Sequence, residues 1–506
     1  MADKTAMQKL LDGVERVGNK VPHPVMIFVY LIGFIIVLST LLSVFGAEVN
    51  YQAYNPATGN IEPANTAARS LLTIEGIRFM YTGVVANFMG FNAVGVIIIA
   101  MVGVGVAEEA GLVKALIRKL VIIAPPKALT YILVFVGILS SIAADAGYLV
   151  LIPLAAAAFL SVGRHPLAGL AAAFAAVASA FLVNILIVPV DGILTEITND
   201  AARLVNPNAS IDLAANLWFS IASTLLLTVL IAFITERVIE PRLGTYTGDY
   251  TVPGENSMSD DETRGLRYAR HAFFGVIGFV LLMLLPPGAP LRNAETGAMI
   301  ANSPFMNSLI VTIALVFLVT GLAYGRGART MNTTNEALGA MQKAIGSLAG
   351  LILLLLVISQ FIAFFNYTNM ATLAAVSMAN VLTQLNLPSI AVLIGFVIAV
   401  MGIDLIITAA IAKWAIFAPV FVPLLMQLGM EPEVVLAAYR VGDSPINSIT
   451  PLNAYFAMIV TFAIKYQKDA GVGTVIALML PYVVVLSVVW TAFLAGWYLL
   501  GLPWGL

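Results

Sequence analysis

Residues 153–172 read PLAAAAFLSVGRHPLAGLAA, and residues 419–438 read PVFVPLLMQLGMEPEVVLAA. Laid over each other at a constant offset of 266 residues, both contain a proline, nine further residues, and then the string G-x-x-P-x-x-x-L-A-A. Matches of leucine and alanine arise easily by chance in so apolar a chain, but two prolines and a glycine at identical spacing do not. We infer an internal repeat, each copy of which follows an interrupted apolar stretch and leads into a long helix.

The composition excludes an ordinary soluble protein. Of the 506 residues, 60% are hydrophobic and 10% are charged, and the mean hydropathy is +0.97. Such values are typical of chains whose main solvent is lipid, and no polar linker divides the apolar runs, so we expect one membrane unit. The formal net charge of −2 gives no indication of a nucleic-acid partner, and the absence of cysteine excludes disulfides and thiolate metal sites.

Apolar runs long enough to cross a bilayer recur along the chain. A spanning helix needs about 20 such residues, and nine windows qualify, near residues 25–46, 93–112, 166–198, 215–236, 271–287, 306–325, 347–365, 432–464 and 474–499. Two further stretches, 129–161 and 388–428, are too long for one helix and are interrupted by SSIAADAG (140–147) and GIDLIITAA (402–410). The pattern predicts an all-α polytopic integral membrane protein with about nine transmembrane helices and two re-entrant helical hairpins.

Basic residues set the predicted orientation. Lysine and arginine gather before the first span and in the segments 114–127, 237–270, 326–346 and 465–473, whereas the alternating segments hold few. Cytoplasmic loops carry such an excess, so we expect the N-terminus in the cytoplasm and the C-terminus outside. Because two extra crossings would preserve the alternation, this bias does not distinguish a hairpin from two full spans.

The repeat provides the argument for hairpins. If the first copy begins with the first span and the second with the sixth, an odd number of crossings separates them, and the repeats are inverted. Inverted repeats with helices broken at mid-membrane are typical of secondary transporters. The predicted organisation is a cytoplasmic amphipathic segment (1–24), a first repeat (25–240), a connecting loop with the fifth span (241–304) and a second repeat (305–506).

Ionisable residues are rare inside the apolar stretches, where each costs about 2.5–3.5 kcal/mol at the bilayer centre on insertion scales. They are Asp145 in the first hairpin, Asp191 in the helix after it, Asp404 and Lys413 in the second hairpin, and Arg440 and Asp443 in the last repeat helix. Both repeat helices contain breakers, NILIVPVD (184–191) and DSPINSITP (443–451), and we expect unwound segments there that face the hairpins. Neutral polar side chains suited to a cation or a carboxylate lie close by: Ser140, Ser141, Asn184, Ser444, Asn447, Ser448 and Thr450.

Each of these residues also has a purely structural interpretation. Arg440 and Asp443 are three residues apart on one helical face, and could form an ion pair without a role in transport. We expect Lys413 to extend toward the membrane interface, and Trp414 could belong to the interfacial aromatic belt. Asp145 could cap the returning half-helix of the first hairpin.

The residues resemble those of a known family. The run 402–456, above all AKW, APVFVP and AYRVGDS, together with DAGYLVLIPLAAAAF (145–159), GRHPLAGLAAAFA (163–175) and QFIAFFNYTNM (360–370), is similar to the p-aminobenzoyl-glutamate transporter (AbgT) family. The resemblance covers essentially the whole chain. It implies a homodimer in the bacterial cytoplasmic membrane, nine transmembrane helices, two opposed hairpins and an elevator motion. It also implies import of p-aminobenzoyl-glutamate, or export of sulfonamide antimetabolites, powered by an ion gradient.

The functional residues that the resemblance implies are Asp191, Trp414, Arg440, Asp443 and Pro451, and Asp404 stands where asparagine is expected. An arginine can grip a carboxylate bidentately and a tryptophan can stack on an aromatic ring, so Arg440 and Trp414 are expected to bind substrate. Asp191 and Asp443 are expected to bind the coupling cation, Na⁺ or a proton, with no other cofactor. We expect Asp443 to stay charged beside Arg440, and Asp191 or Asp404 to carry a proton. The remaining candidates are Asn184, Ser140 and Ser141 for substrate, and Asp145 and Asn447 for the ion.

The sequence leaves three other functions to be considered. A membrane-embedded hydrolase would need a catalytic pair, but the three histidines, His23, His165 and His271, lie at span edges, so we expect no enzyme. A channel would differ in being unable to drive uphill flux. A carrier for another organic anion, such as a dicarboxylate, is separated from the first interpretation only by the family resemblance.

Overall fold

The computed structural model describes residues 22–55, 60–142, 147–248, 258–300, 303–384 and 387–506. The first half contains the helices and strands α2 (Pro24–Val44), β1 (Glu48–Asn55), β2 (Asn60–Ala67), α3 (Ile74–Thr82), α4 (Val84–Met89), α5 (Ala93–Ala110), α6 (Leu112–Ile122), α7 (Leu129–Leu139), α8 (Ile152–Ser161), α9 (Pro166–Ala178), α10 (Pro189–Ala202), α11 (Leu217–Ile234) and α12 (Glu240–Leu243). Short η elements flank three of these helices: η1 (Ser140–Ile142), η2 (Gly147–Leu151) and η3 (Thr235–Ile239).

The second half continues with helices alone. These are α13 (Asp260–Leu284), α14 (Pro304–Asn307), α15 (Leu309–Ala328), α16 (Thr334–Ser347), α17 (Ala349–Tyr367), α18 (Met370–Gln384), α19 (Ser389–Asp404), α20 (Ala410–Gln427), α21 (Pro432–Asp443), η4 (Pro445–Ser448), α22 (Phe456–Ile464) and α23 (Val472–Leu499). The predicted all-α membrane protein is therefore confirmed, with one exception in a predicted connection: β1 and β2 pair as an antiparallel two-stranded sheet.

Eight helices in the described part of the chain are long and apolar enough to cross a membrane. Seven of them, α2, α5, α11, α13, α15, α17 and α23, coincide with predicted crossings, and α11 runs on through η3 to Leu243. The eighth is α20, which is the second arm of the second predicted hairpin. The exact number of crossings, and the depth of that hairpin, stay predictions.

Several of these helices bury little of their surface. Within the spanning windows, only 17% of α2 and 11% of α13 are buried, and large apolar side chains such as Phe34 on α2 and Leu282 on α13 are 58% and 67% exposed. In a bilayer, lipid tails cover such faces, which explains why apolar side chains occur all round these helices.

The remaining two predicted crossings are broken where the sequence predicts breaks. Between Ala178 and Pro189 the chain is not helical, and α10 begins at the proline. In the second repeat, α21 ends at Asp443, η4 makes one short turn, and α22 begins at Phe456. Proline lacks the N–H that would continue the helical hydrogen bonds, which accounts for the interruptions near Pro189 and Pro445. Both predicted hairpins are also interrupted, between α7 and α8 and between α19 and α20.

The 266-residue offset reappears in the backbone. Ser161 ends α8 and Gln427 ends α20, and the glycines two positions later, Gly163 and Gly429, have φ of +76° and +83°. Each glycine closes the same capping motif: the N–H groups of Gly163 and Arg164 donate to the carbonyls of Leu160 and Phe159, and their counterparts at the offset do likewise. A proline three residues after each glycine then begins the next helix, α9 or α21. The two stretches therefore share one local structure, while the opposite orientation of the repeats in the membrane stays a prediction.

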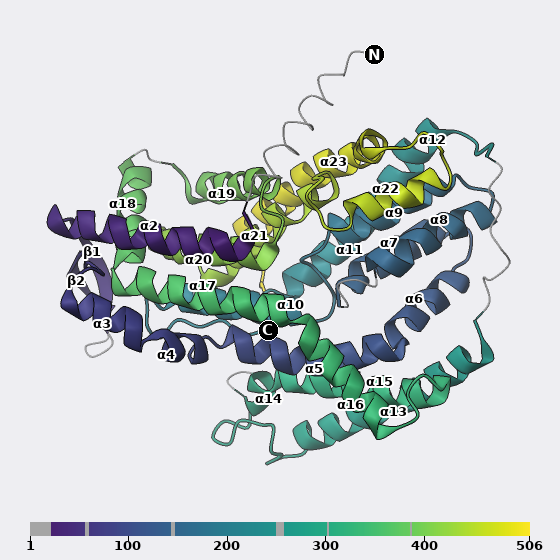
Figure 1. The fold of residues 1–506 in the computed structure, drawn as a ribbon, viewed down its shortest axis with the longest axis horizontal. Coiled ribbons are helices and arrows are strands. Elements are labelled where there is room, and N and C mark those ends of the chain that lie inside the picture. Colours follow the sequence, from purple (N-terminus) through teal and green to yellow (C-terminus); the bar gives the residue numbers. More distant parts are fainter. Residues whose placement is uncertain (1–21, 56–59, 143–146, 249–257, 301–302, 385–386) are drawn as a thin grey trace.

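Each interrupted hairpin packs around the broken helix that follows it. The arms α7 and α8 both contact α9, and the arms α19 and α20 both contact α21. All thirteen residues of α9 are buried, and most are alanine or glycine, which lets neighbouring helices approach closely. In Figure 1, α7, α8, α9 and α22 lie toward the right of the ribbon and α19, α20 and α21 toward its left, with α10 near the centre.

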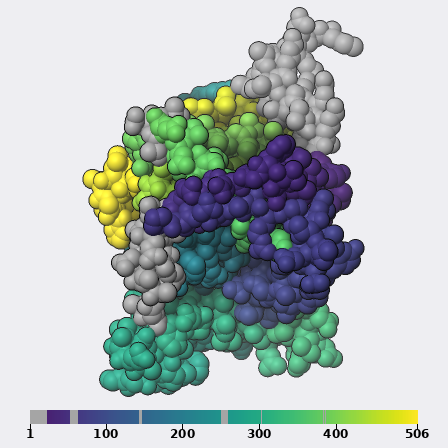
Figure 2. Space-filling view, turned by 90° about the vertical axis from the view of Figure 1, so that its left-hand side faces the viewer, coloured from purple at the N-terminus to yellow at the C-terminus, as the bar shows by residue number. Residues whose placement is uncertain are grey.

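A second group of helices lies to one side. Helix α15 packs between α13 and α5, and α16 also packs on α5. Figure 1 shows α13, α15 and α16 along the lower edge of the ribbon, and Figure 2 shows the same teal and green segments forming the base of the space-filling view. This group has its own small core, which includes Ala107, Tyr324 and Met331. Helix α5, which contributes to this core, also packs against α10 and so joins the group to the region that contains the broken helices.

Replacing Gly163 or Gly429 with alanine tests whether the two turns are equivalent. Each substitution places a Cβ at a left-handed position, at a cost of roughly 1–2 kcal/mol, and we expect both to lower the midpoint of thermal unfolding in detergent by a similar amount. Gly346→Ala is the control, because that glycine has ordinary helical geometry and open space where a Cβ would lie. Unequal effects at the two turns would contradict their equivalence.

Candidate transport site

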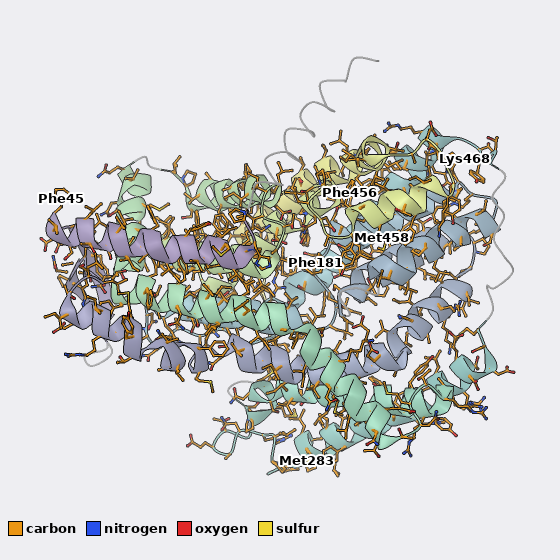
Figure 3. The ribbon with its side chains drawn as sticks, viewed as in Figure 1. Phe45, Phe181, Met283, Phe456, Met458 and Lys468 are labelled. Atoms are coloured by element: carbon orange, nitrogen blue, oxygen red, sulfur yellow. The ribbon has the colours of Figure 1, made fainter. Side chains whose placement is uncertain are left out.

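The two helix breaks meet at the centre of the fold. The Ser179 hydroxyl lies 2.7 Å from the Ser448 hydroxyl and donates to the Pro445 carbonyl over 3.1 Å. The Leu182 N–H donates to the Ser444 hydroxyl over 3.3 Å. Figure 3 labels Phe181, which follows Ser179 in this break, near the middle of the ribbon. The unwound segments of the two halves are thus in direct contact, and the polar groups that unwinding leaves are partly paired with one another.

A buried ion pair joins the halves at this point. Arg440 on α21 donates through Nη1 to Asp191 Oδ1 on α10 over 2.6 Å, and also to the Leu182 carbonyl over 2.9 Å. Its Nε donates to Asn216 Oδ1 over 3.2 Å. Arg440 is 3% exposed and Asp191 is 8% exposed. The guanidinium is therefore held along two edges.

Asp191 also shapes the backbone. Its second oxygen, Oδ2, accepts the Val188 N–H over 2.7 Å and so caps the first turn of α10. A negative charge at this position also interacts favourably with the positive end of the helix dipole. One carboxylate thus fixes the start of the second half-helix and holds the arginine of the other repeat.

The ion pair between Arg440 and Asp443, which their spacing allows, is not the pairing that the structure shows. Spacing along α21 places both on one helical face, but the long arginine side chain reaches across to α10, where Asp191 lies. The shorter Asp443, at the end of α21, pairs with Lys413 of α20 instead, over 2.8 Å. Spacing within one helix could not reveal these partners, because both come from other helices.

A second charged cluster lies at the tip of the second hairpin. Lys413 Nζ pairs with both Asp404, the last residue of α19, and Asp443, and all three side chains are fully buried. The Tyr439 hydroxyl lies 2.8 Å from Asp443 Oδ1 and 2.5 Å from the Ala410 carbonyl oxygen. The expected extension of Lys413 toward the membrane interface is therefore wrong, because two buried carboxylates hold its ammonium group inside the protein.

The charges of this cluster do not balance. With both carboxylates ionised, Asp404, Lys413 and Asp443 carry one excess negative charge, and burying an uncompensated charge costs several kcal/mol, on the order of 3–5 when a partner is missing. Among the residues that the structure describes, Asp404 Oδ2 and Asp443 Oδ2 find no hydrogen-bond partner although both atoms are buried. One further positive charge, from a proton or a cation, would neutralise the cluster.

Trp414 lies beside this cluster and is fully buried. Its indole N–H donates to the Thr198 hydroxyl over 3.1 Å and to the Leu194 carbonyl over 3.2 Å, both on α10. Its ring packs against Tyr439, with 4.4 Å between the centroids. A place in the interfacial aromatic belt is therefore wrong for Trp414, and its stacking on a substrate ring stays a prediction.

The tip of the first hairpin is neutral in the described residues. Asn184, in the first break, donates to the Ser141 hydroxyl over 3.0 Å and to the Leu139 carbonyl over 3.3 Å. Ser140 and Ser141 donate to carbonyls three residues before them. These side chains thus satisfy the end of α7, while Asp145 lies outside the described residues.

The second break contains the last two predicted residues. Asn447 donates to the Asp443 carbonyl over 3.1 Å, and its own carbonyl accepts from Asn453 over 3.0 Å. Pro451 is partly buried, next to Thr450, whose hydroxyl donates to the Leu405 carbonyl over 3.2 Å at the tip of the second hairpin. Both residues stiffen the unwound segment, and their direct contact with an ion or a substrate stays a prediction.

Sequence reasoning missed the role of four residues. Lys413 was assigned to the interface, although a lysine nine positions after Asp404 in an apolar hairpin can turn back to it. In the sequence, nothing distinguishes Tyr439 from an aromatic residue of the core, or Ser179 from the other small residues of an alanine-rich helix. Asn216, at the start of a predicted span, has no local pattern that would point to Arg440.

A cavity of about 590 Å³ adjoins the Asn216 contact. It is lined by Asn206, by the segments 208–212, 431–433 and 503–506, and by Ala215 and Met426. Three acidic side chains, Asp212, Glu431 and Glu433, face this cavity, and burial raises the pKa of Asp212 while the Ala214 N–H opposes that shift. An acidic lining repels anions, so we do not assign the substrate site here.

Replacing Lys413 with methionine tests the buried cluster. The change leaves two buried carboxylates without their cation, and removal of one partner of a buried pair costs roughly 3–5 kcal/mol. We expect Lys413→Met to lower the thermal midpoint strongly, and Asp404→Asn to lower it far less, because Lys413 keeps Asp443. Lys343→Met is the control, since Lys343 is exposed and its pair with Glu109 is a surface pair. Equal midpoints for the two lysine variants would show that the cluster is not buried.

Comparison with known proteins shows the family to which the chain belongs. Residues 9–506 match the model of the family described as "AbgT putative transporter family". The p-aminobenzoyl-glutamate transport protein of Escherichia coli (strain K12) is 34% identical over 497 residues, which cover 98% of this chain and 96% of that protein.

Two solved structures are similar to this chain in both fold and sequence. The structure of Alcanivorax borkumensis YdaH has a TM-score of 0.89 at 39% identity, over 96% of this chain and 100% of that one. The structure of Neisseria gonorrhoeae MtrF, described as one of a class of antimetabolite efflux pumps, has a TM-score of 0.91 at 39% identity, over 96% and 97%. The chain is therefore an integral membrane transporter that belongs to the AbgT family.

Proposed function

We propose that this chain is a secondary transporter, driven by an ion gradient, for p-aminobenzoyl-glutamate and similar aromatic carboxylates, or for the efflux of sulfonamide antimetabolites. The observation that carries the proposal is the buried Arg440–Asp191 pair, 2.6 Å long, where two broken helices meet. The relatives named for p-aminobenzoyl-glutamate transport and antimetabolite efflux align over nearly the whole chain. A protein that transports such anions needs a buried, positively charged side chain that can exchange one anionic partner for another.

Arg440 would bind the substrate carboxylate by exchanging partners. A guanidinium prefers a planar, bidentate carboxylate, and here Nη1 contacts one Asp191 oxygen while Nε contacts Asn216. A substrate carboxylate would take the place of Asp191. The Trp414 and Tyr439 rings, which already pack on each other, would provide an apolar face for the aromatic ring. Ser140, Ser141, Asn184 and Pro451 would line the opposite side of the bound molecule.

The same exchange would couple substrate to ion. Once Arg440 binds a substrate carboxylate, Asp191 loses its counter-charge and requires a cation, either a proton or Na⁺. The cluster of Asp404, Lys413 and Asp443 lacks one positive charge already, so a second cation would bind there, with Asn447 and Asp145 as further contributors. A buried site that closes only when its charges balance would move substrate and cation together.

The transport cycle would follow the family's architecture. We propose an elevator motion in which the broken helices and both hairpins move against the group of α13, α15 and α16, within a homodimer in the bacterial cytoplasmic membrane. We propose a carrier rather than an enzyme, because the buried acids are paired with basic side chains, not arranged as a catalytic pair. A carrier for another organic anion, such as a dicarboxylate, is the second candidate, favoured by Arg440, the one buried arginine among the residues that the structure describes, which any carboxylate could engage.

Replacing Asp191 with asparagine tests the coupling role. The variant keeps the shape of the side chain but needs no cation when Arg440 changes partner, so we expect gradient-driven accumulation in liposomes, measured per folded transporter, to fall to background. Because Arg440 then lacks its counter-charge, the midpoint of thermal unfolding in detergent should fall as well. Asp200→Asn is the matched control, because Asp200 lies on the same helix and pairs with Arg203 near the surface. Undiminished uphill transport by Asp191→Asn would refute this role.

Separate gradients identify the cation and the substrate. Liposomes containing the wild type would be given labelled p-aminobenzoyl-glutamate or a labelled sulfonamide under a Na⁺ gradient, a pH gradient, or neither. We expect accumulation of at least one compound under one gradient, and a smaller charge-to-substrate ratio for Asp404→Asn, since that variant removes the excess negative charge. No movement of either compound would reject the proposed substrates, and an unchanged ratio would reject the role of Asp404.

A further inference from the structure

The carboxyl-terminal segment that follows α23 lies against the neighbours, on both sides in sequence, of Asn216, which binds Arg440. This segment, Pro503–Leu506, is here named the docking segment. The Trp504 carbonyl accepts the N–H groups of Trp218 and Phe219 over 3.0 and 3.2 Å. These N–H groups belong to the first turn of α11, which has no partner for them within the helix. The docking segment therefore satisfies two N–H groups of the first turn of α11, which directly follows Asn216.

Close backbone contact fixes the docking segment in place. A Cβ added to Gly505 would lie 2.0 Å from the Ala214 carbonyl oxygen and 2.6 Å from Ala215 Cα, both of them backbone atoms that cannot simply rotate away. The Trp504 ring packs against Phe219 of α11 and Trp497 of α23, with centroids 5.3 and 6.4 Å apart. Only glycine fits between these backbones, so the position of residues 214–216 depends on the docking segment.

Asn216 transmits that position to the charged pair. It is 4% exposed, and its amide donates to the Glu433 carbonyl over 2.9 Å and to the Ala215 carbonyl over 3.2 Å. These two bonds leave its Oδ1 directed at Arg440 Nε. The NH₂ group and the oxygen of the Asn216 amide are therefore both hydrogen-bonded. The orientation of this amide determines where Nε of the Arg440 guanidinium lies.

We propose that Trp504 and Gly505 are positioning residues for Arg440, acting through Asn216. Asp191 holds one edge of the guanidinium and exchanges with substrate, whereas Asn216 holds the other edge throughout. With Asn216 fixed, the edge of the guanidinium that Asp191 releases is presented to an incoming carboxylate in one orientation. This inference rests on the proposed binding of substrate by Arg440.

Single-methyl substitutions at two glycines provide the first test. Gly505→Ala forces residues 214–216 to shift, whereas Gly496→Ala, in α23 close by, adds a methyl group in open space. A hydrogen bond to a charged group is involved, so we expect Gly505→Ala to raise the KM for p-aminobenzoyl-glutamate by roughly ten-fold with little change in maximal rate. Gly496→Ala should match the wild type. Equal KM values for the two alanine variants would overturn the inference.

Two substitutions of Asn216 separate positioning of Arg440 from a structural role. Asn216→Asp keeps an oxygen for Arg440 but cannot donate to the Glu433 carbonyl, whereas Asn216→Leu loses both functions. We expect the KM of Asn216→Asp to rise less than that of Asn216→Leu, because the carboxylate still offers Arg440 Nε an acceptor although the bonds that orient it are lost, and we expect the KM of Asn216→Leu to rise as far as in Gly505→Ala. If the aspartate variant is as impaired as the leucine variant, Asn216 serves only to tie the backbone, and the inference fails.

The double variant tests whether the two positions act in series. If the docking segment acts through Asn216, Gly505→Ala adds little to the KM once Asn216 is leucine. The same cycle is measured on the midpoint of thermal unfolding in detergent, which needs no substrate. Additive effects in this cycle would overturn the inference. If the wild type transports neither compound, the proposed function fails, and the thermal cycle alone decides the inference.

Discussion

The bond between Arg440 and Asp191 is the interaction on which this arrangement depends. Both groups are charged and nearly inaccessible, and a buried charge without a partner destabilises a protein by several kcal/mol, roughly 3–5 in measured cases. The pair therefore requires α10 and α21 to stay in contact, and that contact brings the two unwound segments together. The capping of α10 by Asp191 extends the same requirement to the backbone.

The two matched stretches share a local backbone structure, but the hairpin tips that precede them differ in chemistry. The second arms of both hairpins end at positions that correspond at the 266-residue offset. Both broken helices begin at a proline three residues after a glycine with positive φ. At the first tip the described polar groups are neutral and satisfy the end of α7, whereas at the second tip a lysine lies between two carboxylates. In the part of the chain that the structure describes, the two hairpin tips of the site therefore differ in charge.

The sequence predicted the architecture better than the partners within the site. Prolines and glycines act locally, so the breaks at 184–191 and 443–451 and the turns at Gly163 and Gly429 could be located without a structure. Most of the charged and polar residues at the site could also be located, because few such residues occur in apolar helices. Their pairing could not, since Lys413 and Asn216 meet their partners across helices that the sequence does not place side by side. The small sheet in a predicted connection was missed because surface hairpins have weak patterns.

Ser179 and Pro445 are equivalent positions in the two repeats, and they touch each other. In a pair of identical half-length chains related by a two-fold axis, such a contact would lie on the axis, and one substitution would change both of its sides. In a single chain the two sides mutate independently. Here one side is the Ser179 hydroxyl and the other is the carbonyl of Pro445 itself, so this contact does not require symmetry. The two halves can therefore differ in chemistry and still keep the surface that joins them.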